Sequence, residues 1–375
     1  MRCALFGASA FNERTYQELR LIDEPTKSLR SIDIAFAFLG LSAHMMMVGD
    51  VWISFMFGKL SSFLWTSSIL LLGRPFLVRA CENINPLMGF LVMQSCQLAL
   101  MLTALRTFSA AMAISDIVAD ATSALATVSF VFAAEMVAVL ASVMNPPRLQ
   151  YMYRGGNSAG SVFFLTVLLS WLLNYEPWTV SVTCAAAVAA AGAAVAGGLY
   201  SMDALRVALT KLKEVRWMQD PYFEVSTIEG SYWSVAADNL VPIGLTLVIQ
   251  APSFYLCYPT GRTVVPSLLA FHLGDLLGHA GGSKVHLNEV WLAVIGGMRV
   301  LLTVAADSPH MPLQPLSWAM KFVVGIGGGL TIEAIYSQLR LASKLSRPRA
   351  VRLINFAVVV ANLISVAAFV RPTRV

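Results

Sequence analysis

The stretch Pro266–Gly282, PSLLAFHLGDLLGHAGG, most narrows what this chain can fold into. It is apolar enough to cross a bilayer, yet it carries His272, Asp275 and His279. Side chains three and four residues apart lie on one face of a helix, so these ionisable groups share a face. An acidic side chain within a span faces a bundle interior or a watery cavity, because exposure to hydrocarbon is costly. The stretch therefore predicts a membrane helix bundle with a polar interior, and a polar stripe of this kind indicates a transport path.

The composition also indicates a polytopic membrane protein. Of the 375 residues, 57% are hydrophobic and 13% are charged, and the mean hydropathy is +0.69. A typical soluble domain has about a quarter of its residues charged. Residues 1–32 carry both charge signs and lack a long apolar run, so no signal peptide is expected there. The net charge of +5 is explained by where the basic residues lie relative to the spans, and no nucleic-acid partner is expected.

Apolar stretches long enough to cross the hydrocarbon predict an all-α protein of about eleven transmembrane helices. The expected spans are 33–57, 61–78, 87–105, 110–144, 150–173, 179–200, 238–257, 264–280, 290–306, 317–337 and 351–370. The corresponding units are a cytosolic tail (1–32), a six-helix bundle (33–200), a cytosolic loop (201–235) and a five-helix bundle (236–375).

The basic residues predict the orientation of these spans. With the N-terminus inside, most of the 26 Lys and Arg residues fall in tails and loops on the inner side. Cytosolic segments of membrane proteins carry such an excess. We therefore expect a cytosolic N-terminus and an extracellular C-terminus in a multi-pass protein of the plasma membrane, in contact with membrane lipid.

Asp275 is the first candidate for substrate contact, because a carboxylate can accept hydrogen bonds from sugar hydroxyls or from an amino group of a base. One hypothesis is that Asp275 and His279 form a protonation-sensitive pair. The alternative is a helix-packing contact in which Arg299 is the true counter-ion. Arg299 lies within a span and needs an acid, either Asp275 or Glu333, in a gating or structural ion pair.

Four further residues are candidates for substrate contact. His272 and His44 can hydrogen-bond a substrate or a neighbouring carbonyl group. Glu135 lies deep in an apolar stretch, where it can contact substrate or carry a proton. Met47 ends a run of three methionines that either lines a soft apolar wall for a base ring or packs in the core.

The sequence gives little sign of an enzyme, a metal site or a redox site. No HExxH or DxxD…DxxD pattern occurs, and a GxSxG spacing at residues 156–160 lies within a predicted span, so an enzyme is not expected. The five cysteines are scattered without a CxxC pair. His44, His272, Asp275 and His279 are metal-ligand types, but a single helix rarely supplies a complete cage. We predict no metal and no cofactor.

Several motifs resemble the equilibrative nucleoside transporter family. FHLGDLLGH, Phe271–His279, is similar to the eighth-span motif Phe-Asn-x-x-Asp-x-x-Gly-Arg. The family's Asp and Gly stand at Asp275 and Gly278, whereas His272 and His279 replace its Asn and Arg. Weaker matches are Glu135 near a Gln, residues 155–160 near a Ser-Gly-Gln-Gly-x-Ala-Gly run, Arg299 at a ninth-span arginine, and residues 327–330 where the family usually reads Ser-Asn-Gly-Tyr. Met47 and Val48 depart from the family, which commonly has Trp-Asn at these positions.

The resemblance implies a 6+5 arrangement of two bundles around a central cavity, similar to the major facilitator architecture. It also implies alternating access for nucleosides or nucleobases, by facilitated diffusion or with a proton. Carriers of this kind place the substrate near the midplane between the two halves. The departures at His272, His279 and Gly328 keep open an alternative, a degenerate carrier that acts as a non-transporting scaffold or receptor. Which base or sugar is carried also stays open.

Overall fold

The computed structural model describes residues 27–73, 86–109, 116–129, 146–171, 264–282, 287–308 and 314–338, with isolated residues at 132, 285 and between 359 and 367. The regular structure within these ranges is α-helical, in agreement with the predicted all-α class. The predicted spans 179–200 and 238–257, the loop 201–235 and most of 351–370 lie outside the described residues. The count of eleven helices and their 6+5 division therefore stay predictions.

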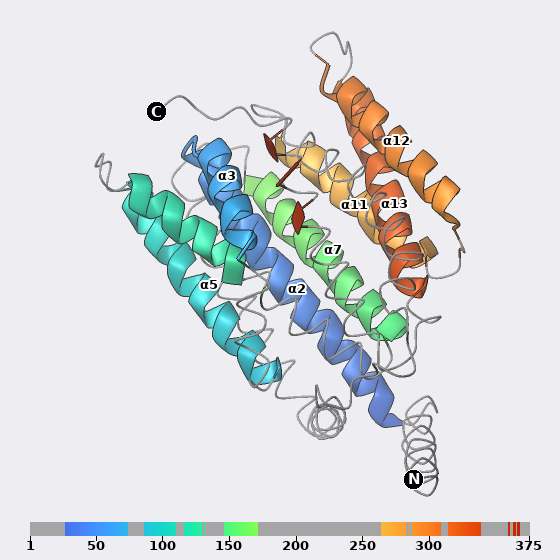
Figure 1. The fold of residues 1–375 in the computed structure, drawn as a ribbon, viewed down its shortest axis with the longest axis horizontal. Coiled ribbons are helices and arrows are strands. Elements are labelled where there is room, and N and C mark those ends of the chain that lie inside the picture. The colour runs from blue at the N-terminus through green and yellow to red at the C-terminus, as the bar shows by residue number, and fades with distance from the viewer. Residues whose placement is uncertain are drawn as a thin grey trace, which may run out of the picture.

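The described helices lie side by side along most of their length (Figure 1). In chain order they are α2 (Lys27–Met56), α3 (Leu60–Leu71), α5 (Pro86–Ser109), α7 (Pro146–Trp171), α11 (Val264–Gly282), α12 (Glu289–Ala306) and α13 (Gln314–Gln338). Residues 116–129 are also helical. Helix α2 packs on α7, α7 on α11, α11 on α13, and α13 on α12. Helix α11, which carries the polar stripe of His272, Asp275 and His279, thus lies between α7 and α13.

The helix ends differ from the predicted spans where local chemistry decides them. Helix α2 begins at Lys27, so the last residues of the predicted tail 1–32 are helical. Helix α3 ends at Leu71, well before the predicted end at 78. A turn closes α3, since the amides of Leu72 and Gly73 bond to carbonyls within its last turn. Helix α7 begins at Pro146, because a proline in the first turn lacks only an N–H that has no helical partner there.

Glycines bring two pairs of helices into backbone contact. A Cβ atom added to Gly156 of α7 would overlap the Ala37 carbonyl of α2, and one added to Gly278 of α11 would overlap the Ile326 carbonyl of α13. The same holds, on one or the other pair, for Gly40, Gly160, Gly274, Gly325 and Gly329. Small residues at such interfaces are typical of helices that associate within a membrane. Each pair is therefore closely interlocked.

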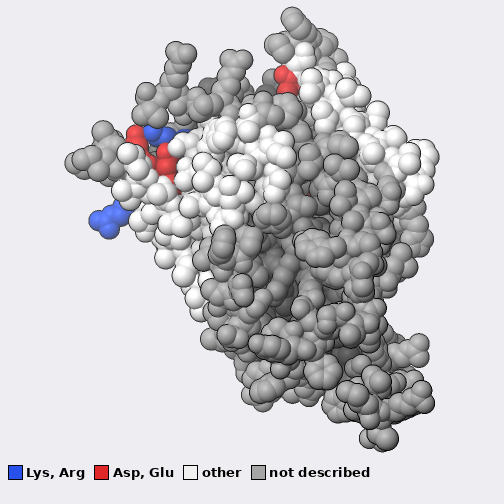
Figure 2. All heavy atoms as spheres, viewed as in Figure 1, with Lys and Arg blue, Asp and Glu red and all other residues white. Residues whose placement is uncertain are grey.

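Several charged or polar side chains are buried, and many large apolar side chains are exposed. Fully buried side chains include Asp50, Gln97 and Lys321, at 0% exposure. Large apolar side chains of α12 are exposed, namely Val290, Trp291, Val294, Met298, Leu301 and Val304. On the face drawn in Figure 2 the charged side chains of the described residues gather toward the upper part of the view. Extended apolar surface of this kind suits contact with lipid.

One helical segment within the described part of the chain, Gln314–Ile335, is by length and composition long and apolar enough to cross a membrane. Shorter apolar helical stretches occur at Phe36–Val51, Ser61–Leu71, Val92–Ala104 and Val290–Ala306.

Candidate functional site

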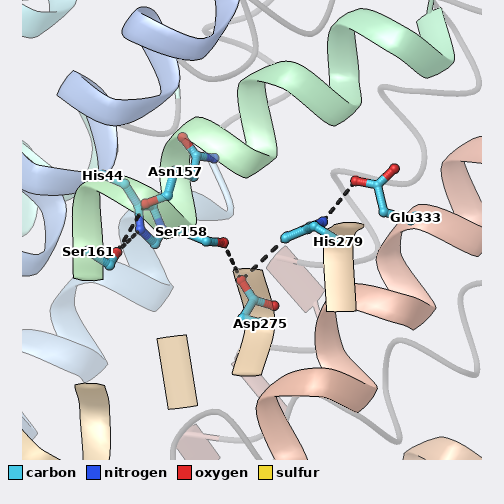
Figure 3. A network of polar contacts seen from close by, with 7 residues as sticks. All are labelled: His44, Asn157, Ser158, Ser161, Asp275, His279 and Glu333. Atoms are coloured by element: carbon cyan, nitrogen blue, oxygen red, sulfur yellow. Dashed lines mark hydrogen bonds and ion pairs between the residues drawn. The ribbon is translucent and has the colours of Figure 1, made fainter. Parts of the chain in front are cut away.

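One buried polar network joins α7, α11 and α13 (Figure 3). Ser158 Oγ of α7 donates to Asp275 Oδ2 of α11 at 2.5 Å. His279 Nε2, one turn further along α11, lies 3.4 Å from the same carboxylate oxygen. His279 Nδ1 lies 2.8 Å from Glu333 Oε1 of α13. Asp275 thus faces the bundle interior, and its side chain is 16% exposed.

His279 has a carboxylate beside each ring nitrogen. Carboxylates accept hydrogen bonds when ionised, and a neutral imidazole has only one N–H to donate. Hydrogen bonds at both nitrogens therefore require an imidazolium ion or a protonated carboxyl group. The Asp275–His279 pair expected from the sequence is present, and Glu333 adds a second carboxylate to it. Asp275, His279 and Glu333 can therefore form both contacts when at least one extra proton is bound among them.

Arg299 reaches toward the same region from α12. Its side chain is buried, and its Nε donates to the Val324 carbonyl of α13 at 3.0 Å. A Cβ added to Gly328 would lie 3.0 Å from Arg299 Nη2 and 3.3 Å from Asp275 Oδ1. The guanidinium and the carboxylate therefore both lie beside the same glycine.

The sequence suggested two counter-ions for Asp275 in this region, His279 and Arg299. Asp275 contacts His279 directly. Arg299 Nη2 and Asp275 Oδ1 both lie close to the position that a Cβ on Gly328 would take, so the positive charge of Arg299 is near Asp275 as well. Glu333 forms its ion pair with His279. The gating or structural pair of Arg299 with Glu333 that the sequence suggested stays a prediction.

Two histidines from different halves of the chain meet beside the network. The rings of His44 on α2 and His272 on α11 lie edge to face with centroids 5.7 Å apart. His44 Nδ1 is hydrogen-bonded to Ser161 Oγ of α7. His272 is buried, and neither its Nδ1 nor Asn157 Oδ1 has a hydrogen-bond partner among the described residues. Buried polar atoms without partners are uncommon, and each can bond a ligand atom.

Two predicted site residues, Met47 and Glu135, are not among the contacts described above. Met47 is half-buried on α2, one turn after His44. Glu135 lies outside the described residues. The roles of both in substrate contact stay predictions.

Three polar residues of α7 were not predicted for the site. Asn157 and Ser158 fall within residues 155–160, the glycine-containing run that the sequence analysis compared with a family motif, and Ser161 follows it directly. Close helix packing is present at Gly156 and Gly160, whereas a Cβ on Gly155 would have nothing within 4 Å. The signal that was missed is the spacing of three small polar side chains within five residues, which places them near one face of the helix.

Comparison with known proteins adds little. No protein-family model matches this chain, and no curated protein matches it. Among solved structures, the crystal structure of a variant of the E. coli fucose:proton symporter, FucP, is similar over 90% of this chain and 98% of that one. The sequence identity is 9% and the TM-score is 0.34, a similarity too weak to assign a fold or a function.

Proposed function

We propose that this protein is a multi-pass membrane carrier that moves nucleosides or nucleobases by alternating access. The observation that supports this most directly is the buried Asp275, which is hydrogen-bonded across the boundary between the two predicted halves. An ionisable side chain within a span is by default functional, since burying it without a task is costly. Its partner Ser158 belongs to the first half of the chain, and α11 belongs to the second.

The contacts within the halves and between them differ in kind. The glycine-mediated backbone contacts of α2 with α7, and of α11 with α13, lie within one half each. The Ser158–Asp275 hydrogen bond and the His44–His272 ring contact lie between the halves. Such an arrangement suits a rocking motion in which each interlocked pair moves as a unit and the few polar contacts break and re-form.

The polar groups at this boundary suit a small heterocycle or sugar with several donors and acceptors. Asp275 offers carboxylate oxygens, while Asn157 Oδ1 and His272 Nδ1 have no partner among the described residues. The imidazole faces of His44 and His272 offer flat surfaces for a planar base. A nucleoside or nucleobase carries this combination of a planar ring and exchangeable hydrogens, which agrees with the family resemblance at Phe271–His279.

Uptake into proteoliposomes by wild type and by Asp275→Asn tests the proposal. The substitution keeps the shape and removes the charge. Hydrogen bonds to charged groups contribute about 1.5–3 kcal/mol, so uptake should fall by roughly 10- to 150-fold at limiting substrate. Leu277→Ala is the matched control, because Leu277 lies on α11 with 56% exposure and makes no polar contact with the network. Competition with a panel of purines and pyrimidines then identifies the substrate.

The outcomes separate the carrier from its alternatives. Equal uptake by wild type and Asp275→Asn would remove Asp275 from the site. Absence of uptake by either protein, with both correctly folded, would favour the non-transporting scaffold or receptor. Labelling of cysteines introduced near each terminus in intact cells would test the expected cytosolic N-terminus and extracellular C-terminus.

Proton coupling is a separate part of the proposal, supported by His279 between two carboxylates. An inwardly directed proton gradient should accelerate uptake by wild type. His279→Gln retains hydrogen bonding but cannot become charged, so its uptake should be independent of the gradient. Gradient-independent uptake by wild type, with no proton current, would leave facilitated diffusion as the mechanism.

A further inference from the structure

A second buried carboxylate lies in the first half of the chain. Asp50 of α2 is 0% exposed. Ser123 Oγ donates to Asp50 Oδ1 at 2.6 Å, and Thr127 Oγ1 donates to Oδ2 at 3.0 Å. Ser54 Oγ lies 3.0 Å from Ser123 Oγ. Four oxygen-bearing side chains therefore meet where α2 packs on the helix of residues 116–129.

The spacing of these residues explains why they meet. Asp50 and Ser54 are four residues apart on α2, and Ser123 and Thr127 are four residues apart on the facing helix, so each pair occupies one face. His44 lies six residues before Asp50, about 9 Å along the helix axis. This cluster is therefore distinct from the network around Asp275.

Asp50 has no cationic partner among the described residues. Charged groups also lie just beyond the end of α2. Lys59 Nζ lies 2.9 Å from Asp116 Oδ2, and Asp120 Oδ2 accepts from Ser62 at 2.6 Å. The other titratable side chains described on α2 are Asp33 and His44, the latter bonded to Ser161. Those described on the helices packed against α2 are the exposed Cys96 and Arg106 of α5, and Tyr151, Tyr153 and Arg154 of α7. Helix α3 carries no titratable side chain.

We propose that Asp50, with Ser54, Ser123 and Thr127, is a binding site for a monovalent cation, either a proton or Na⁺. A fully buried carboxylate must bind a proton or a counter-charge, since an isolated ion in a low-dielectric interior is strongly disfavoured. An all-oxygen set of ligands suits hard cations. Each hydroxyl can turn to donate to the carboxylate or to present its lone pairs to a cation.

Cation occupancy would control how α2 is held against residues 116–129. With the site empty of cation, Ser123 and Thr127 donate to the charged carboxylate, as the hydrogen bonds in this structure allow. With Na⁺ bound, the hydroxyl hydrogens must turn away from the ion. With a proton bound, the carboxyl group becomes a donor itself and one hydroxyl becomes an acceptor. The inference is independent of the proposed substrate, because occupancy can be measured without it.

The test is an unfolding titration of the purified full-length protein in lipid nanodiscs. One arm varies Na⁺ against choline at fixed pH, and the other varies pH without Na⁺. For one site, each tenfold rise in free cation above the Kd raises the folded-to-unfolded ratio up to tenfold. Wild type should respond in one arm, and Asp50→Asn should lose that response. Asp116→Asn is the matched control, because Asp116 is 46% exposed and should leave the response unchanged.

The arm that responds identifies the cation. A Na⁺ response that disappears in Asp50→Asn assigns Na⁺, and an acid response that disappears without any Na⁺ effect assigns the proton. Identical responses of wild type and Asp50→Asn would overturn the proposal, because the four side chains would then be an interhelical contact only.

A second variant covers the case in which Asp50→Asn fails to fold. Ser123→Ala with Thr127→Val keeps the carboxylate and removes two hydroxyls. It should weaken Na⁺ binding several-fold, or shift the midpoint of the acid response to higher pH, because bonds that favour the charged form are lost. An unchanged response in this double variant would also refute the site.

Discussion

A methyl group placed on Gly278 tests whether backbone contact between α11 and α13 shapes the site. The added Cβ of Gly278→Ala would overlap the Ile326 carbonyl and lie 3.0 Å from the Gly329 Cα, both of them backbone atoms of α13. Backbone atoms in a helix cannot rotate aside as a side-chain end can. The two helices must therefore separate, or the helix must distort.

The size of the effect follows from two opposing terms. Overpacking of a closely packed site costs typically about 1–3 kcal/mol. Replacement of a helical glycine by alanine contributes about 0.5–1 kcal/mol in the other direction. The net loss of unfolding free energy should be about 1–2 kcal/mol, and the melting temperature should fall by roughly a few degrees.

Gly297→Ala is the matched control, because a Cβ on Gly297 of α12 would have nothing within 4 Å. Only the propensity term applies there, so this variant should be more stable than wild type by about 0.5–1 kcal/mol. Thermal unfolding in nanodiscs, monitored by fluorescence, compares the two. Shifts of the same sign for both variants, or no loss for Gly278→Ala, would refute the reasoning.

Two further predictions concern charged groups at the same helices. Asp307→Asn breaks a 2.6 Å ion pair to the fully buried Lys321 and should lower the unfolding free energy by about 3 kcal/mol or more. Lys321→Met instead leaves the Asp307 carboxylate, which is 21% exposed and can be hydrated, so thermal unfolding should show a smaller loss of stability. Gly328→Ala should fold normally, because the added methyl group meets only the ends of the Arg299 and Asp275 side chains, which can shift by tenths of an ångström. It should nevertheless lose uptake, because the methyl group changes the spacing of the guanidinium and the carboxylate. Unchanged uptake would show that this spacing is unimportant.

Local regularities made much of the helical part predictable. A helix repeats every 3.6 residues, so the shared face of His272, Asp275 and His279 followed from their spacing alone. The apolar runs predicted the bodies of α2, α5, α7, α11, α12 and α13. Helix ends were predicted less well, because the short turn after α3 and the prolines in the first turn of α7 act within one or two residues.

The chain by itself determined that it forms apolar helices with a polar stripe on α11, since composition and periodicity are local properties. Only the tertiary structure decided the partners of that stripe: Ser158 from α7, Glu333 from α13 and the Arg299 side chain across Gly328. The physical reason is that a buried charge is satisfied by whichever polar group the packing of distant helices brings within about 3 Å. That packing depends on glycine contacts between segments tens of residues apart, which no local pattern specifies.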